Sequence, residues 1–334
     1  MKRKVISVFF IGLLLLGNSR VSFGDTEKIM YAKEQTWLYS SGHETARYAV
    51  VPIGKNQKVA TKGLVKAILS GGRKVYYYEV ECLGQILYIP RSKVSSRKPA
   101  KPVSIRYLFK ELKVDDKIKI HDRPSILGKV LKTKDRSIYT IGQAGNWYVV
   151  YIEGKIGYIR KNSDSIKNVR KPDYIPIRIS DKEYPDTAER TNMKERIYLQ
   201  YAQLSQKIRE RLMQRNVEIY CKEHFIEPFE GNGSLGYTES RPHKAVIYLK
   251  DEGIEFSFIH EVGHAVTRYL LNEDKDLDKL LLEQRKLKLE PYYAKSMSEW
   301  AAEILRVLVK SPKELKEKAP RSYLFLMRQV LNVY

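Results

Sequence analysis

Two histidines and a glutamate are the residues of this 334-residue chain whose spacing most directly suggests chemistry. His260, Glu261 and His264 form an H-E-x-x-H pattern. Positions i and i+4 of a helix lie on one face, so both imidazoles can bind the same zinc ion. The glutamate between them can then act as a general base toward a water molecule. Because the pattern also occurs by chance, a third ligand is needed before it indicates a metal site.

The third ligand has to come from another segment, because no histidine or aspartate follows within eight residues of His264. A helical pattern that begins near Ser296 carries Glu299 and Glu303 one turn apart. Two such carboxylates repel by about a few tenths of a kcal/mol, and a divalent cation would turn that cost into a gain for Glu299. Glu303 could then accept a ring N–H of a ligand histidine. The alternative is a capping box in which Ser296 is the N-cap and Glu299 completes it.

The elements that must position these residues can also be predicted. Apolar and long side chains three or four apart predict one helix over 191–217, followed by a strand at 218–221. The glycine-rich segment 231–236 predicts a flexible loop, and 244–249 predicts a strand whose edge could bind an extended substrate peptide. Gly263 costs about 1 kcal/mol of helix propensity. It either lets another segment approach closely or is a tolerated surface glycine.

The first half of the chain predicts β structure, because short alternating runs rich in Val, Ile and Tyr are broken by Gly, Asn and Asp. A strand, a glycine-containing turn and a second strand at 78–89 recur at 148–159, at a constant offset of 70 residues. Two copies of one β module are therefore expected at 28–95 and 104–165. The basic, proline-bearing stretch 95–102 is expected to be a spacer between them.

The second copy resembles bacterial SH3-like domains. Its residues 147–159 follow the pattern W-x-x-V-x-x-x-G-x-x-G-Y-I, which is typical of the end of such a domain, and the resemblance covers about 60 residues per copy. The first copy departs from the pattern, since Tyr77 replaces the tryptophan and Leu87 replaces the second glycine. The resemblance implies binding of cell-wall peptides. The alternative is a structural spacer or a cover for the following domain.

The two candidate helices together resemble the anthrax lethal-factor-like zinc metallopeptidases, a family that includes the Pro-Pro endopeptidases of Gram-positive bacteria. The resemblance rests on H-E-V-G-H at 260–264, Tyr292, E-W-A-A-E at 299–303 and K-A-P at 318–320. It covers residues 186–334 and implies an α+β zincin-like fold. It also implies that His260, His264 and Glu299 hold one zinc ion, that Glu261 is the general base, and that Glu303 orients a ligand histidine.

The same resemblance implies that Tyr292 donates a hydrogen bond to the oxyanion of the tetrahedral intermediate. Adjacent Tyr293 could take that position if the register shifted by one residue. Cleavage beside proline is implied by one branch of the family, and no residue of this chain defines the specificity pocket.

The first 24 residues are typical of a secretory leader. A basic start at 2–4 precedes an apolar run at 5–17 that is short for a membrane span, and small residues at 22 and 24 predict cleavage before Asp25. A retained membrane anchor is the alternative. We expect a secreted protein that, after cleavage, has no membrane partner and is a monomer.

The formal net charge of +22 favours an anionic partner. Export and the lack of a recognisable nucleic-acid module argue against nucleic acid, so an anionic cell-wall polymer or peptidoglycan fits better. Cys82 and Cys221 are the only cysteines and fall in different predicted domains. We therefore expect neither a disulfide nor a cysteine-ligated zinc.

Together these features predict a multidomain protein with two small all-β SH3-like barrels, a polar linker at 166–185, and an α+β zincin-like metallopeptidase domain at 186–334. We expect a zinc endopeptidase that cleaves extracellular or cell-surface proteins and is held at the wall by its SH3-like domains. One alternative is hydrolysis of peptidoglycan peptides. The other is a non-catalytic wall-binding protein with a vestigial peptidase domain, against which the intact set of site residues argues.

Overall fold

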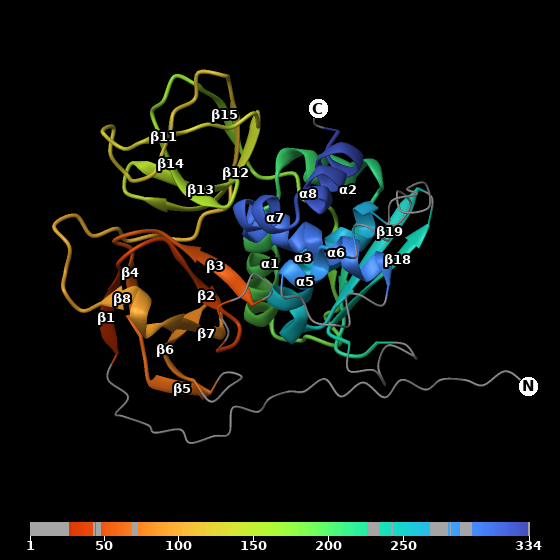
Figure 1. The fold of residues 1–334 in the computed structure, drawn as a ribbon, viewed down its shortest axis with the longest axis horizontal. Helices are drawn as coiled ribbons and strands as arrows, with labels where there is room; N and C mark the ends of the chain where they lie inside the picture. Colours follow the sequence, from red (N-terminus) through yellow and green to blue (C-terminus); the bar gives the residue numbers. More distant parts are fainter. Residues whose placement is uncertain are drawn as a thin grey trace, which may run out of the picture.

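The computed structural model describes residues 27–42, 44, 48–68, 73–225, 234–241, 243–267, 280, 282–287 and 296–332. In this part of the chain, antiparallel sheets come first and helices around a mixed sheet follow, so the fold is mixed α/β (Figure 1). The expected leader at 1–24 lies outside the described residues. No helix among the described residues is long and apolar enough to cross a membrane.

The first β unit contains two sheets. Its strands are β1 (Lys28–Ala32), β2 (Thr36–Tyr39), β3 (Ala49–Ile53), β4 (Lys58–Thr61), β5 (Leu64–Ile68), β6 (Lys74–Cys82), β7 (Gln85–Pro90) and β8 (Val94–Ser95), with the short 3-10 helix η1 (Arg91–Lys93) before β8. One sheet has the order β4-β1-β8 and the other the order β3-β2-β7-β6-β5.

The second β unit is one seven-stranded sheet with the order β11-β10-β14-β13-β12-β9-β15. Its strands are β9 (Glu111–Val114), β10 (Ile120–His121), β11 (Val130–Leu131), β12 (Ser137–Ala144), β13 (Trp147–Ile152), β14 (Lys155–Arg160) and β15 (Ile166–Arg170). A bulge in β12 at the pairing with β13 bends the sheet.

The two hairpins predicted from the sequence repeat are confirmed. In the first, Cys82 pairs with Gln85 across a turn in which Leu83 and Gly84 have φ values of 50° and 77°. In the second, residues 152 and 155 pair across a turn in which Glu153 and Gly154 have φ values of 48° and 80°. Two successive residues with positive φ match the twist of the flanking strands, as in a type I′ hairpin.

Neither β unit forms a closed barrel in the part of the chain that the structure describes. Among the described residues, the end strands of the five-stranded sheet, β3 and β5, do not pair with one another, and neither do β11 and β15. The antiparallel sheets are therefore as expected, whereas the SH3-like character of the two units stays a prediction.

The segment 166–185, which the sequence predicted to be a linker, contributes strands to both of its neighbours. β15 extends the second β unit by pairing with β9, and β16 (Ile177–Ile179) pairs in parallel with β17 (Glu218–Cys221) of the following sheet. Arg170 on β15 forms an ion pair with the buried carboxylate of Glu111 at 2.7 Å. Backbone pairing with β9 therefore holds this polar segment as a strand, and the ion pair adds a side-chain contact to it.

The C-terminal unit, residues 177–332, has a four-stranded sheet with the order β16-β17-β19-β18, in which β18 is Gly236–Arg241 and β19 is Lys244–Leu249. Its helices are α1 (Thr187–Tyr201), α2 (Gln206–Gln214), η2 (Asp251–Gly253), α3 (Ile254–Thr267), α5 (Gln284–Leu287), α6 (Met297–Lys310), α7 (Pro312–Lys318) and α8 (Pro320–Phe325), followed by the π-helical turn η5 (Leu326–Val330).

Two expectations for this unit were wrong. β19 lies inside the sheet, because it pairs in parallel with β17 over residues 246–249 and antiparallel with β18 over residues 244–249. The single helix expected over 191–217 is divided into α1 and α2, because Ser205 caps a new helix by accepting the N–H of Ile208 at 3.4 Å. The strands at 218–221 and 244–249 are confirmed. Cys82 and Cys221 are both buried and free, as expected.

Both β units contact the C-terminal end of α6. The Tyr151 hydroxyl donates to the carbonyl oxygens of Val309 and Lys310 at 3.2 Å each. The Lys310 ammonium donates to Gln200 Oε1 at 3.0 Å and lies 4.8 Å from the Trp37 ring centroid. Burial lowers the pKa of Lys310 well below its usual range. The β units therefore share a polar junction with the helical unit.

A buried ion pair joins α1 to the beginning of α3. The Arg196 guanidinium donates to Asp251 Oδ1 at 2.6 Å and to both carboxylate oxygens of Glu255, one of them at 2.6 Å. Arg196 and Glu255 are both buried. Since breaking such a pair leaves an uncompensated charge inside the protein, this contact has a large effect on the stability of α3.

We predict that Arg196→Met lowers the free energy of unfolding by about 3 kcal/mol, because Glu255 stays buried without its partner. Urea-induced unfolding, followed by circular dichroism, measures the change. Lys182→Met is the matched control, since Lys182 is exposed and its replacement should change the free energy by less than about 0.5 kcal/mol. Equal free energies of unfolding for the two variants would contradict the conclusion that the Arg196–Glu255 ion pair stabilises the fold.

Candidate zinc and catalytic site

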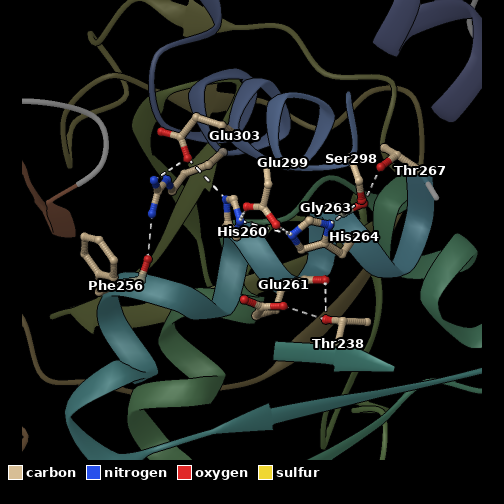
Figure 2. A network of polar contacts seen from close by, with 11 residues as sticks. Thr238, Phe256, His260, Glu261, Gly263, His264, Thr267, Ser298, Glu299 and Glu303 are labelled. Atoms are coloured by element: carbon tan, nitrogen blue, oxygen red, sulfur yellow. Dashed lines mark hydrogen bonds and ion pairs between the residues drawn. The ribbon is translucent and has the colours of Figure 1, made fainter. Parts of the chain in front are cut away.

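The candidate site lies between α3 and α6, which pack side by side (Figure 2). Gly263 on α3 makes this packing possible. A Cβ atom at position 263 would lie 2.5 Å from the Ala302 Cα and 2.8 Å from the Ala302 carbonyl oxygen. The glycine is buried, so it permits close approach and is not a tolerated surface residue.

Three side chains with potential ligand atoms converge between the two helices (Figure 2). The Nε2 atoms of His260 and His264 are 3.1 Å apart. Glu299 on α6 places Oε2 at 3.1 Å from His260 Nε2 and Oε1 at 3.4 Å from His264 Nε2. The structure therefore brings the three predicted ligands together, although Glu299 lies 39 residues after His260 in the sequence.

The other ring nitrogens have acceptors of their own. His260 Nδ1 lies 3.3 Å from Glu303 Oε2, and His264 Nδ1 lies 3.0 Å from Ser298 Oγ. Arg306 also donates to Glu303 Oε2 and so holds that carboxylate in place. If each Nδ1 carries the proton, each Nε2 presents a lone pair toward Glu299. The contact of Ser298 with His264 was not predicted from the sequence. The one feature that could have indicated it is the position of Ser298 next to Glu299.

These residues fit a zinc ion. Zinc bonds of about 2.0–2.2 Å to nitrogen and oxygen in a tetrahedral site place ligand atoms roughly 3.3–3.6 Å apart. The three separations of 3.1, 3.1 and 3.4 Å lie close to that range. When both Nε2 atoms carry no proton, the two imidazoles and the carboxylate are all acceptors and repel one another, and a shared cation turns that repulsion into attraction.

The alternative for Glu299, a capping box, is not supported. Ser296 occupies the N-cap of α6, but its side chain makes no capping hydrogen bond. The Glu299 carboxylate instead faces the two imidazoles (Figure 2).

Glu261 lies near the imidazoles but has a different partner. Its carboxylate and the two histidines have ligand-type atoms within 4.8 Å of one another. The Thr238 hydroxyl on β18 lies 2.7 Å from the carboxylate oxygen Oε2 of Glu261 and 3.1 Å from the Glu261 carbonyl oxygen. The shorter contact is the one to the carboxylate. The hydrogen bond therefore engages one carboxylate oxygen of Glu261, Oε2, with β18. Glu299, with both oxygens on imidazoles, is therefore the better third ligand. Thr238 was not predicted from the sequence.

The charged side chains of the site shift one another's pKa values. Burial opposes a charged imidazole, but hydrogen bonds to Glu299 and Glu303 outweigh it and raise the pKa of His260 to about 9. Burial would raise the pKa of Glu299, yet its contacts with the two histidines hold it well below the usual range. The pocket thus favours an ionised carboxylate beside positive charge.

Two parts of the predicted site lie outside the described residues. These are Tyr292 and Tyr293, the candidate oxyanion donors, and residues 231–233 of the predicted loop at 231–236. The roles assigned to His260, Glu261, His264, Glu299 and Glu303 stay predictions that the observed arrangement accommodates.

Gly263→Ala tests the close packing of α3 on α6. Helix propensity alone would make alanine more stable by about 1 kcal/mol, whereas contact with the Ala302 backbone should reverse the sign and lower the free energy of unfolding by about 1–2 kcal/mol. Gly63→Ala is the control, because its Cβ would meet only the Glu79 side chain, at an ordinary 3.4 Å. A more stable Gly263→Ala protein in denaturant unfolding would show that the helices can separate without cost.

Comparisons with known proteins found no matching family model and no matching curated protein. Among solved structures, the chain is similar to a Pro-Pro endopeptidase (PPEP-2) from Paenibacillus alvei, with a TM-score of 0.33 and 18% sequence identity. The match covers 45% of this chain and 94% of that one.

Proposed function

We propose that this protein is a zinc-dependent endopeptidase that hydrolyses peptide bonds of extracellular or cell-surface proteins. The observation that carries the proposal is the convergence of His260 Nε2, His264 Nε2 and a Glu299 carboxylate within 3.4 Å, with Glu261 beside them. Three protein ligands with a further glutamate nearby are typical of hydrolytic zinc sites, which keep one coordination position for water or substrate.

A zinc ion held by these three atoms would supply a Lewis acid that polarises the scissile carbonyl group and makes water more acidic. Glu261 would accept the proton from the attacking water on Oε1 and later deliver it to the leaving amine. The Thr238 hydroxyl would hold Oε2 and so keep Oε1 oriented. Tyr292, outside the described residues, keeps its predicted role as donor to the oxyanion.

The substrate would add to β18. This strand is at the edge of the four-stranded sheet, and among the described residues no strand pairs with its outer side. It carries Thr238, whose side chain reaches Glu261, so a peptide extended along β18 would pass close to the catalytic base. Cleavage beside proline remains part of the proposal through the sequence resemblance.

The sequence supports the location. A leader-like N-terminus and a net charge of +22 favour an exported protein that acts at an anionic surface, with the two β units as binding modules for a wall polymer or peptidoglycan. If peptidoglycan peptides were cleaved and proteins were not, the same site would instead belong to a wall hydrolase.

The first test separates catalysis from metal binding. Glu261→Ala should lower the rate of peptide hydrolysis by about 10³-fold while the protein keeps about one zinc per chain, since Glu261 supplies proton transfer and no ligand. Glu299→Ala should lose zinc as well as activity.

Elemental analysis measures the zinc content and a randomised peptide library measures hydrolysis, with exposed Glu252→Ala as the matched control. An active Glu261→Ala enzyme would rule out the proposed mechanism, and full zinc occupancy in Glu299→Ala would rule out the ligand set.

The second test concerns the orientation of Glu261. Thr238→Val keeps the shape of the side chain but removes the hydroxyl, so kcat should fall roughly tenfold with little change in KM or zinc content. Thr238→Ser should restore kcat because it retains the donor. If the valine and serine variants have the same kcat, the hydroxyl does not position the base.

A further inference from the structure

The second β unit carries an exposed aliphatic tip. Ile126 and Leu127 lie in the turn between β10 and β11, and their exposed fractions are 67% and 80%. Val130, at the start of β11, is 46% exposed. The end of the hairpin therefore presents neighbouring aliphatic side chains to water as one apolar surface.

Hydrogen bonds hold this tip in shape. Gly128 N–H donates to the Ser125 carbonyl at 2.9 Å, and the Arg123 guanidinium donates to the Leu127 carbonyl at 2.9 Å. At the base of the turn, Asp122 Oδ1 accepts the N–H of Lys129 at 2.9 Å. The backbone is therefore fixed by its own contacts, and the exposure of the two aliphatic side chains is a property of the turn.

Positive charge surrounds the tip. Between residues 117 and 134 the one acidic residue is Asp122, which is engaged with the turn backbone. Exposed cations lie in the turn and on the segments that flank the two strands, at Lys117, Lys119, Arg123, Lys129, Lys132 and Lys134. Antiparallel pairing of Ile120 with Leu131 places Lys119 and Lys132 opposite one another, so the cations line both sides of the hairpin.

We propose that the β10–β11 hairpin docks onto an anionic lipid bilayer, with Ile126 and Leu127 entering the interface and the flanking cations contacting lipid headgroups. A soluble polyanion would use the cations but would offer no apolar phase for the two aliphatic side chains. An anionic bilayer satisfies both features, since apolar insertion and electrostatic attraction add. This departs from our expectation, based on sequence, of no membrane partner after leader removal.

The position of the hairpin is compatible with docking. In Figure 1, β11 lies on the far side of the second β unit from the sheet strands β18 and β19. A bilayer bound at the tip would therefore leave the edge strand β18 accessible. The inference does not depend on the proposed peptidase activity, because it rests on the second β unit alone.

The test is flotation with lipid vesicles, using the chain from Asp25 onward so that the apolar leader does not contribute. The protein should bind vesicles that contain equal parts of phosphatidylglycerol and phosphatidylcholine, and binding should weaken with salt and be absent with phosphatidylcholine alone. Ile126→Ser with Leu127→Ser should lower the partition coefficient at least about tenfold, since two large aliphatic groups no longer leave water.

Leu282→Ser is the matched control, because Leu282 is similarly exposed, at 71%, but lies in the C-terminal unit. It should bind vesicles as the unchanged protein does. A second variant, Lys129→Glu with Lys132→Glu, should also lose binding and retain the unchanged thermal unfolding midpoint. The proposal is overturned if the serine pair binds as tightly as the control, or if binding is equal on neutral vesicles. It is also overturned if the protein ignores vesicles but binds purified wall polymer or peptidoglycan through Ile126 and Leu127.

Discussion

The close contact between α3 and α6 is the constraint on which the candidate site depends. Without a Cβ at Gly263, the Ala302 backbone can lie against α3, and the first turns of α6 then reach across it. Glu299 can therefore bridge both imidazoles, while Glu303 and Ser298 contact the outer ring nitrogens. A wider helix separation would leave the histidines without their carboxylate partner. The geometry of the site is thus a result of backbone packing first and of side-chain chemistry second.

Local patterns in the sequence predicted much of this arrangement. Helices α3 and α6 follow from apolar periodicity, and the two hairpins follow from a repeat whose glycine can adopt positive φ. Glu299 could be singled out because an unexplained carboxylate pair one turn apart costs energy unless something compensates it. Each of these features depends on residues close together in the chain, where spacing alone determines which side chains share a face.

The missed features depend on contacts between distant segments. Thr238 has no local signal, since its importance comes from β18 lying at the sheet edge beside α3. The same holds for β15, whose pairing with β9 overrides its polar composition. The break between α1 and α2 could have been found, because Ser205 is a good cap, but the apolar spacing continued through it. Tertiary contacts override local preference in each case.

The junction at Lys310 affects how the β units are placed relative to the candidate site. The last residue of the helix that begins at the candidate metal site is enclosed by Gln200, Gln203 and Trp37, and Tyr151 binds its carbonyl. Both β units therefore contact the helical unit directly at the C-terminal end of α6, through Trp37 and Tyr151. In the function proposed above, a surface bound by the β units would therefore lie at a set distance from the peptide bond cleaved at the candidate site.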